Sequence, residues 1–263
     1  MSPKLVICDI DGTLANRGKV SDRTFAAIQS LRAAGIGFSV ATGRAAGLLH
    51  PMDAHKYDGI AICDNGALTY DVGKDQVLAC ELIEGDVVGT MAEQVSQKYP
   101  ELQLGLSRIT PHPRAMFSEP RHVEVYNFGQ EALQVTDFGL FPAAKVWAIN
   151  RDLRSNVIGE MLEPIVGDLV EISWSSEGSG LVEMTARGVT KASACAALAH
   201  RWGIDVADVV AIGDMTNDLE MLAWAGTAIV PENGNDDAKA HADQIIDHID
   251  NDGIAVYLES LIP

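Results

Sequence analysis

The sequence predicts an α/β protein with a parallel-sheet core, helices on both faces of that sheet, and an inserted α+β cap. Short apolar runs that end in polar residues alternate with helical patterns near both ends of the 263-residue chain, as in a parallel sheet. Between them, from about residue 77 to residue 186, strand-like runs cluster with polar turns, which is typical of an antiparallel α+β unit. We therefore predict a core of residues 1–83 and 187–263, interrupted by a cap of residues 84–186.

The first part of the core is expected to alternate strand and helix. The apolar run Leu5–Ile10 forms the first strand, and the helix that follows is capped by Ser21 and ended by Gly35. The stretches IGFSVATGR and YDGIAICDNGA are the second and third strands, which end at Thr42 and near Asp64. A short helical stretch lies between them. Apolar strands joined by helices indicate a Rossmann-like sheet.

The same sequence patterns predict the elements of the cap and of the second part of the core. In the cap we expect helices near 85–98 and 151–162 and strands near 102–106, 122–127, 145–149, 168–174 and 181–185. The α/β alternation then resumes with the helix TKASACAALAHRWG, the strand DVVAIGD, the helix TNDLEMLAWAG and the strand TAIV. A final helix, GIAVYLESLI, ends the pattern.

Composition and charge exclude several classes of partner. The formal net charge of −18 repels phosphate backbones and anionic lipids, so we expect no nucleic-acid and no membrane partner. No apolar run approaches the ~20 residues that span a bilayer, and no signal peptide is expected. The four cysteines lack the C-x-x-C spacing of a zinc site and fit reduced thiols in a cytoplasmic protein. The sequence leaves the oligomeric state open.

Two aspartates stand at the end of the first strand, in the stretch LVICDIDGTLAN. Buried carboxylates are costly unless they are paired, hydrogen-bonded or bound to metal. Residues two apart in a strand point to the same side, so Asp9 and Asp11 face one site. Gly12 allows a tight turn there, and the Thr13 hydroxyl can bond to a loop or a metal shell. A cap or turn role explains one of the two carboxylates well and both of them poorly.

Other polar residues stand at the ends of neighbouring strands or in the adjoining helix. Ligands of parallel α/β sheets bind beyond the carboxyl ends of the strands, so these residues are expected to share one edge. Lys191 is notable because a cation in the first turn of a helix gains nothing from the helix dipole. An incoming phosphate or a carboxylate would explain it. The set comprises Thr42, Gly43, Arg44, Asp64, Asn65, Lys191, Asp214, Asn217 and Asp218.

This residue set indicates phosphoryl-transfer chemistry. Carboxylates that converge without a His or Cys pattern favour a hard cation, Mg²⁺ rather than zinc. Mg²⁺ with a lysine and a threonine hydroxyl is typical of phosphoryl transfer. The sequence contains neither a G-x-x-x-x-G-K-[ST] loop nor a G-x-S-x-G elbow, so a P-loop nucleotidase and a serine esterase are both disfavoured. The nucleophile that remains is a carboxylate.

The segments DIDGT, ATGR and GDMTND, with Lys191 between the last two, resemble in this order the four motifs of the haloacid dehalogenase superfamily of phosphohydrolases. The chain is most similar to the Cof-type members, whose large α+β cap is inserted between the third strand and the lysine motif. The motifs cover about residues 1–83 and 187–263 and are specific as a set. The cap matches by position and length only.

The resemblance implies a role for each matching residue. Asp9 would be the nucleophile that forms an aspartyl-phosphate, and Asp11 the general acid and base. Thr42, Gly43, Lys191 and Asn217 would hold the phosphoryl group. Mg²⁺ would be bound by Asp9, the backbone carbonyl of Asp11 and Asp214, with Asp218 orienting that shell. The implied activity is hydrolysis of small phosphate monoesters, sugar phosphates or related metabolites; candidate substrate contacts are Arg44, Asn65, Arg114 and Arg121.

Three alternatives stay open at this point. A phosphomutase of the same superfamily would release no net phosphate. A phospho-aspartate regulatory domain also uses acids, a Thr and a Lys on a parallel sheet, but it needs only about 120 residues and ends its third strand in the acceptor. Asp64 could mimic that acceptor. A catalytically inactive binding protein is disfavoured because all four motifs are intact.

One segment of the cap is basic in an otherwise acidic chain. The stretch SRITPHPRAMFSEPRH carries Arg108, Arg114, Arg121 and two histidines against one acid, Glu119. It is either a solvated surface loop or a source of contacts at the mouth of the site. Arginine suits the second role because its planar fork pairs with carboxylate or phosphate oxygens.

Overall fold

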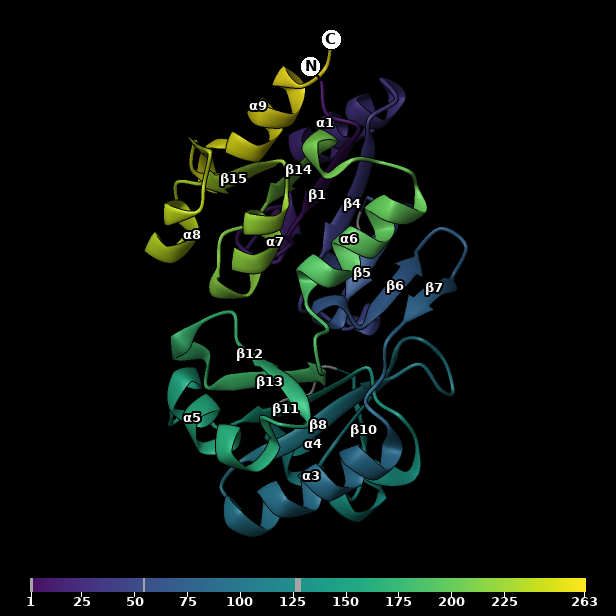
Figure 1. The fold of residues 1–263 in the computed structure, drawn as a ribbon, viewed down its shortest axis with the longest axis vertical. Coiled ribbons are helices and arrows are strands. Elements are labelled where there is room, and N and C mark those ends of the chain that lie inside the picture. Colours follow the sequence, from purple (N-terminus) through teal and green to yellow (C-terminus); the bar gives the residue numbers. More distant parts are fainter. Residues whose placement is uncertain (1, 54, 126–128) are drawn as a thin grey trace.

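The computed structural model describes residues 2–53, 55–125 and 129–263. Two sheets dominate these residues, one of eight strands and one of six. Figure 1 shows them one above the other, with the chain passing from the upper sheet to the lower one and back. The six-stranded sheet is built only from residues between 103 and 186, inside the segment that the sequence predicts as a cap. The boundaries at 84 and 186 stay predictions.

The eight-stranded sheet has the order β16-β15-β14-β1-β4-β5-β6-β7. Its strands from β16 to β5 run parallel, as the alternation of apolar strands and helices predicts. β6 and β7 extend it as an antiparallel pair that the sequence does not predict. The bounds are β1 (Leu5–Cys8), β4 (Gly37–Ala41), β5 (Ile60–Cys63), β6 (Leu68–Asp71), β7 (Gln76–Cys80), β14 (Val209–Ile212), β15 (Thr227–Pro231) and β16 (Gln244–Ile246).

Helices cover both faces of this sheet. On one face α1 and α9 pack against Val6, Phe38 and neighbouring apolar residues. On the other face α6 and α7 bury Leu198 and Met221 against Ile7 and its neighbours. The side chain of Ser21 caps α1 by accepting a hydrogen bond from the Thr24 amide, as its position predicts. The bounds are α1 (Asp22–Ala33), α2 (His50–Asp53), α6 (Lys191–Arg201), α7 (Leu219–Trp224), α8 (Asp236–Ala240) and α9 (Gly253–Ser260). A short hairpin, β2 (Ala15–Asn16) and β3 (Lys19–Val20), follows β1.

The six-stranded sheet has the order β10-β9-β8-β11-β13-β12 and is antiparallel except for the pair β10 and β9. Alternate residues of its strands point to one face and form an apolar core with α3 and α5. Figure 1 shows these helices below the sheet, on the side away from the larger sheet. The bounds are α3 (Gly85–Lys98), β8 (Gln103–Arg108), β9 (Ala115–Ser118), α4 (Pro120–Val125), β10 (Glu131–Ala132), β11 (Lys145–Ile149), α5 (Ser155–Val166), β12 (Val170–Ser173) and β13 (Leu181–Ala186).

One element of the cap differs in type from the expectation. The sequence predicts a strand over 122–127, but the structure has α4 there up to Val125. Residues 126–128 lie outside the described residues. Pro120 supplies the reason, since proline is well suited to the first position of a helix and cannot donate to a sheet ladder. The strand of this region is instead β9.

The membrane and thiol expectations can be compared with the described residues. No helix among them is long and apolar enough to cross a bilayer. All four cysteines are free thiols, and Cys8, Cys63 and Cys195 are buried. Burial raises the pKa of each of these three thiols, so they are held in the protonated, unreactive form.

Candidate active site

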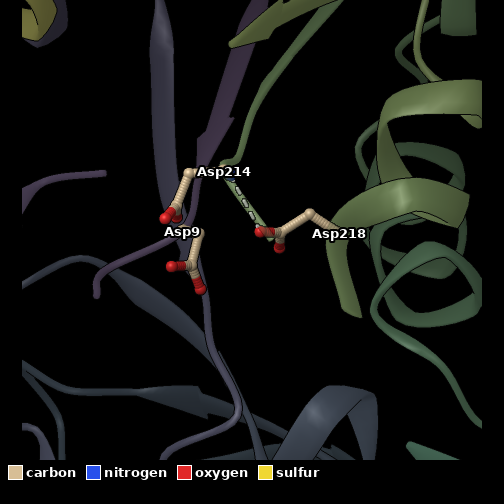
Figure 2. Close-up of side chains that lie close together, drawn as sticks. All are labelled: Asp9, Asp214 and Asp218. Atoms are coloured by element: carbon tan, nitrogen blue, oxygen red, sulfur yellow. Dashed lines mark hydrogen bonds between the residues drawn. The ribbon is translucent and has the colours of Figure 1, made fainter. Parts of the chain in front are cut away.

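The predicted site residues gather where β1, β4, β5 and β14 end. Asp9 follows β1 directly and Asp214 stands two residues after β14. These two strands are neighbours in register, with Cys8 opposite Ile212, so their carboxyl ends lie side by side. Figure 2 shows the side chains of Asp9, Asp214 and Asp218 turned toward one another. The sheet topology therefore brings together carboxylates that are about 200 residues apart in the sequence.

Lys191 is the cation at the centre of this group. Its Nζ donates to Asp9 Oδ1 at 2.6 Å and to Asp218 Oδ1 at 2.7 Å, and its side chain is 1% exposed. Thr190 and Ser193 form a capping box at the start of α6, which fixes the turn that carries the lysine. Burial acts to lower the pKa of Lys191, but the carboxylates of Asp218 and Asp9 together raise it above its ordinary value. The ammonium group is therefore permanently charged.

Asp218 serves mainly to hold the loop after β14. Its Oδ2 accepts hydrogen bonds from the backbone N–H groups of Asp214 and Met215, at 3.0 and 3.1 Å. Its Oδ1 accepts the bond from Lys191. Both oxygens are thus engaged, and the side chain is fully buried. This arrangement fits the orienting role implied by the resemblance better than direct ligation of a metal.

Asp214 is positioned by Thr13 and by the absence of a side chain at Gly12. The Thr13 hydroxyl donates to Asp214 Oδ1 at 2.7 Å. Gly12 has a φ of +82°, and a Cβ on it would lie 2.3 Å from Asp214 Oδ2. Burial, followed by the nearby charge of Asp218, raises the pKa of Asp214 to about 7. This carboxylate therefore lacks a sufficient positive partner in the protein itself.

Asp11 lies at the edge of the group and has a different partner. Arg44 Nε and Nη2 donate to its two carboxylate oxygens at 2.6 and 2.7 Å, a paired contact. The Asp11 side chain is 50% exposed, whereas that of Asp9 is 8% exposed. Arg44 also donates to the carbonyl oxygen of Leu48 at 3.0 Å, which fixes its direction. The two aspartates of the first strand thus differ in environment, one buried against Lys191 and one accessible.

The loops after β4 and β5 lie beside this acidic group. Thr42 is buried, and its hydroxyl accepts a hydrogen bond from the Arg44 amide at 3.1 Å. The backbone N–H of Asn65 donates to the Thr42 carbonyl oxygen at 3.1 Å. The side-chain Nδ2 of Asn217 donates to Asn65 Oδ1 at 3.2 Å. Asn65 itself has a φ of 52°, which asparagine tolerates better than most residues. The predicted residues Thr42, Gly43, Asn65 and Asn217 are therefore brought together.

A cavity of about 620 Å³ opens above these residues. Its wall on the core side includes Asp9, Asp11, Thr42, Gly43, Arg44 and Asn217. Its wall on the cap side is provided by the six-stranded sheet and α4 and includes Met116, His122, Trp147, Ile149, Arg151 and Leu181. The site is thus a partly open cavity between the two sheets, with the acidic group on one side and a wall of mixed apolar and polar cap residues on the other.

Two of the predicted cap contacts lie elsewhere. Among the described residues that line the cavity, neither Arg114 nor Arg121 is present. Arg121 donates to the Leu102 carbonyl at 2.6 Å, and the Arg114 guanidinium lies 5.8 Å from the centre of the Tyr70 ring. Arg108 is buried and donates to the Phe138 carbonyl, so its role is structural. From the basic segment it is Met116 and His122 that line the cavity.

A buried connection between the two sheets was not predicted from the sequence. Lys145, on β11, donates to Glu183 Oε1 at 2.5 Å and to the carbonyl oxygen of Gly43, and its Nζ lies 3.5 Å from Asp64 Oδ1. Glu183 also accepts a hydrogen bond from Asn65 Nδ2 at 2.9 Å. Burial acts to lower the pKa of Lys145, but Glu183 and Asp64 together raise it. A lone lysine in a strand pattern gave no signal of this contact.

The donor set fits a hard divalent cation. One ligand oxygen each from Asp9, Asp214 and Asp218 lies within 4.8 Å of the others, and all three residues are buried. Burial raises the pKa of Asp9 although Lys191 opposes the rise, and Asp214 shows the same direction. Carboxylates gathered at this electrostatic cost are stabilised when a cation joins them. Asp9 and Asp214 each keep one carboxylate oxygen that could bind a cation, whereas both oxygens of Asp218 already accept hydrogen bonds.

Comparison with known proteins identifies the family. A model of the haloacid dehalogenase-like hydrolases matches residues 6–258. Pyridoxal phosphate phosphatase YbhA of Escherichia coli K12 is 27% identical over 99% of each chain, and phosphoglycolate phosphatase of Methanopyrus kandleri is 26% identical over 98% of this chain and 97% of its own. The solved structure of the HAD subclass IIB sugar phosphatase BT4131 matches 98% of each chain with a TM-score of 0.83 at 20% identity. This chain therefore belongs to the haloacid dehalogenase-like hydrolase family.

Proposed function

We propose that this hydrolase is an Mg²⁺-dependent phosphatase that transfers the phosphoryl group of a small phosphate monoester to Asp9 and then to water. The observation that carries the proposal is the buried Asp9 carboxylate, held by Lys191 and lining a cavity beside Asp214. The ammonium group of Lys191, 2.6 Å from Asp9 Oδ1, supports a carboxylate as the nucleophile. The phosphatase relatives over nearly the whole chain support the same reaction class.

In the first step the Asp9 carboxylate attacks phosphorus and the bond from phosphorus to the ester oxygen breaks. Asp11 donates a proton to that departing oxygen, so the alcohol leaves neutral. In the second step Asp11, now a carboxylate, takes a proton from water, whose oxygen attacks the phosphorus of the aspartyl-phosphate. Inorganic phosphate leaves and Asp9 is restored. The exposed position of Asp11 suits a group that exchanges protons, and the buried position of Asp9 suits a covalent nucleophile.

The remaining residues act on the charge and position of the phosphoryl group. Lys191 provides fixed positive charge beside Asp9, which lowers the repulsion between a carboxylate and a phosphate dianion. Thr42, Gly43 and Asn217 line the cavity, and in this proposal they donate hydrogen bonds to phosphoryl oxygens. Mg²⁺ would be held by Asp9, Asp214 and the backbone carbonyl of Asp11, and would supply further charge stabilisation. Asp218 would keep Asp214 and Lys191 in place.

The relatives do not determine the substrate. Their names refer to a pyridoxal phosphate, a phosphoglycolate and a sugar phosphate, which share only the phosphate ester. We therefore infer a small phosphorylated metabolite as the partner and leave its leaving group to the cap residues. The free thiols and the acidic charge support a cytoplasmic location. A phosphomutase remains the alternative, since the same core can return the phosphoryl group to a sugar.

Replacement of Asp9 tests the proposal. Asp9→Asn and Asp9→Ala should each lower the release of inorganic phosphate by several orders of magnitude, because covalent catalysis is lost. Phosphate release from a panel of esters, measured with and without Mg²⁺, provides the assay. As a control, Asp86→Asn changes an aspartate in the first turn of α3, within the cap, and should leave activity unchanged. Turnover near that of the wild type in both Asp9 variants would exclude the mechanism, and a bisphosphate requirement without net release would establish the mutase.

A further inference from the structure

The face of the six-stranded sheet that borders the cavity differs from the face that packs on α3 and α5. Leu104, Val146 and Val182 point into the apolar core with these helices. Because side chains alternate along a strand, the residues next to them point the opposite way, toward the cavity. The register places Gly105, Trp147 and Glu183 in one row across β8, β11 and β13. Trp147, in the middle of this row, is the largest side chain among the described residues that line the cavity.

Trp147 extends over a position that has no side chain. A Cβ on Gly105 would lie 2.2 Å from Trp147 Cζ2 and 2.3 Å from Cε2, so the indole fills the space that any other residue at 105 would take. The ring therefore lies across β8 and covers the floor of the cavity on the cap side. The His122 ring, on α4, borders the same space with its centroid 6.2 Å from that of the indole. Together they present two unsaturated rings to the cavity.

The surroundings of the indole are apolar along the strand and polar at one margin. Ile149 and Leu181 border it on the side away from Lys145. Lys145 and Glu183, its polar neighbours on the other side, are engaged with each other and with the core. Arg151 also lines the cavity and is close enough to His122 to affect its titration. Gln130, Ser175 and Ser179 line the same cavity. A bound group above Trp147 thus meets the apolar side chains of Ile149 and Leu181, with polar side chains and the cation of Arg151 farther along the wall.

We propose that the cap selects phosphate monoesters whose leaving group carries a flat unsaturated ring, which stacks on Trp147, with an acceptor oxygen or an anionic substituent directed to Arg151. This inference rests on the proposed phosphatase function, with Asp9 as the nucleophile. Trp147 is a specificity-determining residue in this proposal, because it contacts the leaving group and takes no part in the transfer of the phosphoryl group.

The physical argument sets an aromatic leaving group against a saturated or polyhydroxylated one. An aromatic ring gains offset-stacking contacts with an indole beyond those due to its buried area, and a saturated ring of equal carbon number does not. A polyol gains no stacking contact with the indole, and any of its hydroxyls that face Ile149 or Leu181 lose their hydrogen bonds to water. The binding energy arises away from the breaking bond, so it serves to choose the substrate.

The test compares three esters of primary alcohols: benzyl phosphate, cyclohexylmethyl phosphate and glucose 6-phosphate. The first two have equal carbon number and differ in the planarity and unsaturation of the ring. We expect the wild-type enzyme to favour benzyl phosphate by about 5-fold or more in kcat/KM over each of the others. Trp147→Leu should lower kcat/KM for benzyl phosphate about 10-fold and change it less than about 2-fold for cyclohexylmethyl phosphate. Trp147→Phe should retain most of the preference.

Trp202→Leu is the matched control, because Trp202 ends α6 and is 40% exposed, away from the cavity. It should leave all three values unchanged, and thermal unfolding of each variant reports on its folding. The inference is wrong if the wild type hydrolyses these esters but prefers the glucose ester. It is also wrong if Trp147→Leu remains folded and lowers kcat/KM equally for benzyl and cyclohexylmethyl phosphate. In both cases the phosphatase assignment stands. If the wild type releases phosphate from none of a broad panel of esters, the phosphatase proposal itself fails, and the inference with it.

Discussion

Replacement of Lys145 by methionine tests the buried connection between the two sheets. Lys145→Met keeps an unbranched side chain of similar length but removes the ammonium group. In the structure this group donates to Glu183 and to the Gly43 carbonyl and lies 3.5 Å from Asp64. The side chains of Lys145, Glu183 and Asp64 are 5%, 10% and 1% exposed, so water screens none of them well. The variant therefore leaves two buried carboxylates beside each other without their cation.

The expected loss follows from this geometry. Removing one partner of a buried ion pair typically costs 3–5 kcal/mol of unfolding free energy, so we expect about 3 kcal/mol at pH 8, at the lower limit because the carboxylates can take up a proton. Burial already raises the pKa of Asp64, and loss of Lys145 raises it further. A carboxyl group whose pKa is higher in the folded state than in the unfolded state destabilises the protein as the pH rises from the unfolded-state pKa through the folded-state pKa. The difference from wild type should thus be smaller at pH 5 than at pH 8.

Urea denaturation, followed by both tryptophan fluorescence and far-UV circular dichroism, measures the loss. Lys74→Met is the matched control, because Lys74 pairs with Asp71 but is 75% exposed, and it should cost at most about 0.5 kcal/mol. The double variant Lys145→Met with Glu183→Gln removes one of the two unpaired charges and should recover part of the loss. A loss below about 1 kcal/mol for Lys145→Met at both pH values would refute this account of the connection.

Two further predictions concern the core. Asp11→Asn should lower kcat/KM for alkyl phosphates at least about 100-fold but much less for 4-nitrophenyl phosphate, whose leaving group needs no proton; equal losses on both would leave Asp11 a structural role only. Asp214→Ala should raise the Mg²⁺ concentration needed for half-maximal activity at least about 10-fold, and chelation should abolish activity in the wild type. Because the pKa of Asp214 is raised to about 7 and that of Asp9 is raised as well, Mg²⁺ competes with protons in this range, so the apparent Mg²⁺ affinity measured by calorimetry should rise from pH 5.5 to pH 8. An affinity that is constant over this range would argue against ligation by Asp214.

The core could be predicted from the sequence because its chemistry stands at strand ends. Apolar runs such as Leu5–Cys8 identify the strands, and a parallel sheet then places the residues after them at one edge. Asp9, Thr42 and Asp214 could therefore be predicted to lie close together from the sequence alone. The sequence could not supply the pairing of Asp11 with Arg44, because side-chain partners across loops depend on the backbone directions that the loops adopt.

The cap wall could not be predicted in the same way. Lys145, Trp147 and Glu183 lie in the middle of strands, where a sequence pattern shows which residues share a face but not what that face meets. Arg114 and Arg121 were predicted as substrate contacts because of their charge. In the structure Arg114 lies over the Tyr70 ring and Arg121 donates to the Leu102 carbonyl oxygen. The stretch after Pro120 misled for a related reason, since its alternation mimics a strand while the proline starts a helix.

The return crossing from β13 to α6 has a consequence for how substrate could enter. Thr190, the residue before Lys191, is fixed against the core, since a Cβ on Gly66 would lie only 2.2 Å from its carbonyl oxygen. Gly188, two residues earlier, has a φ of +75° and open space around it. Rotation of the cap-side wall would thus be absorbed at Gly188 before it reached Thr190. The catalytic charges would then keep their places while the entrance widened, so that admission of substrate would leave the catalytic group assembled.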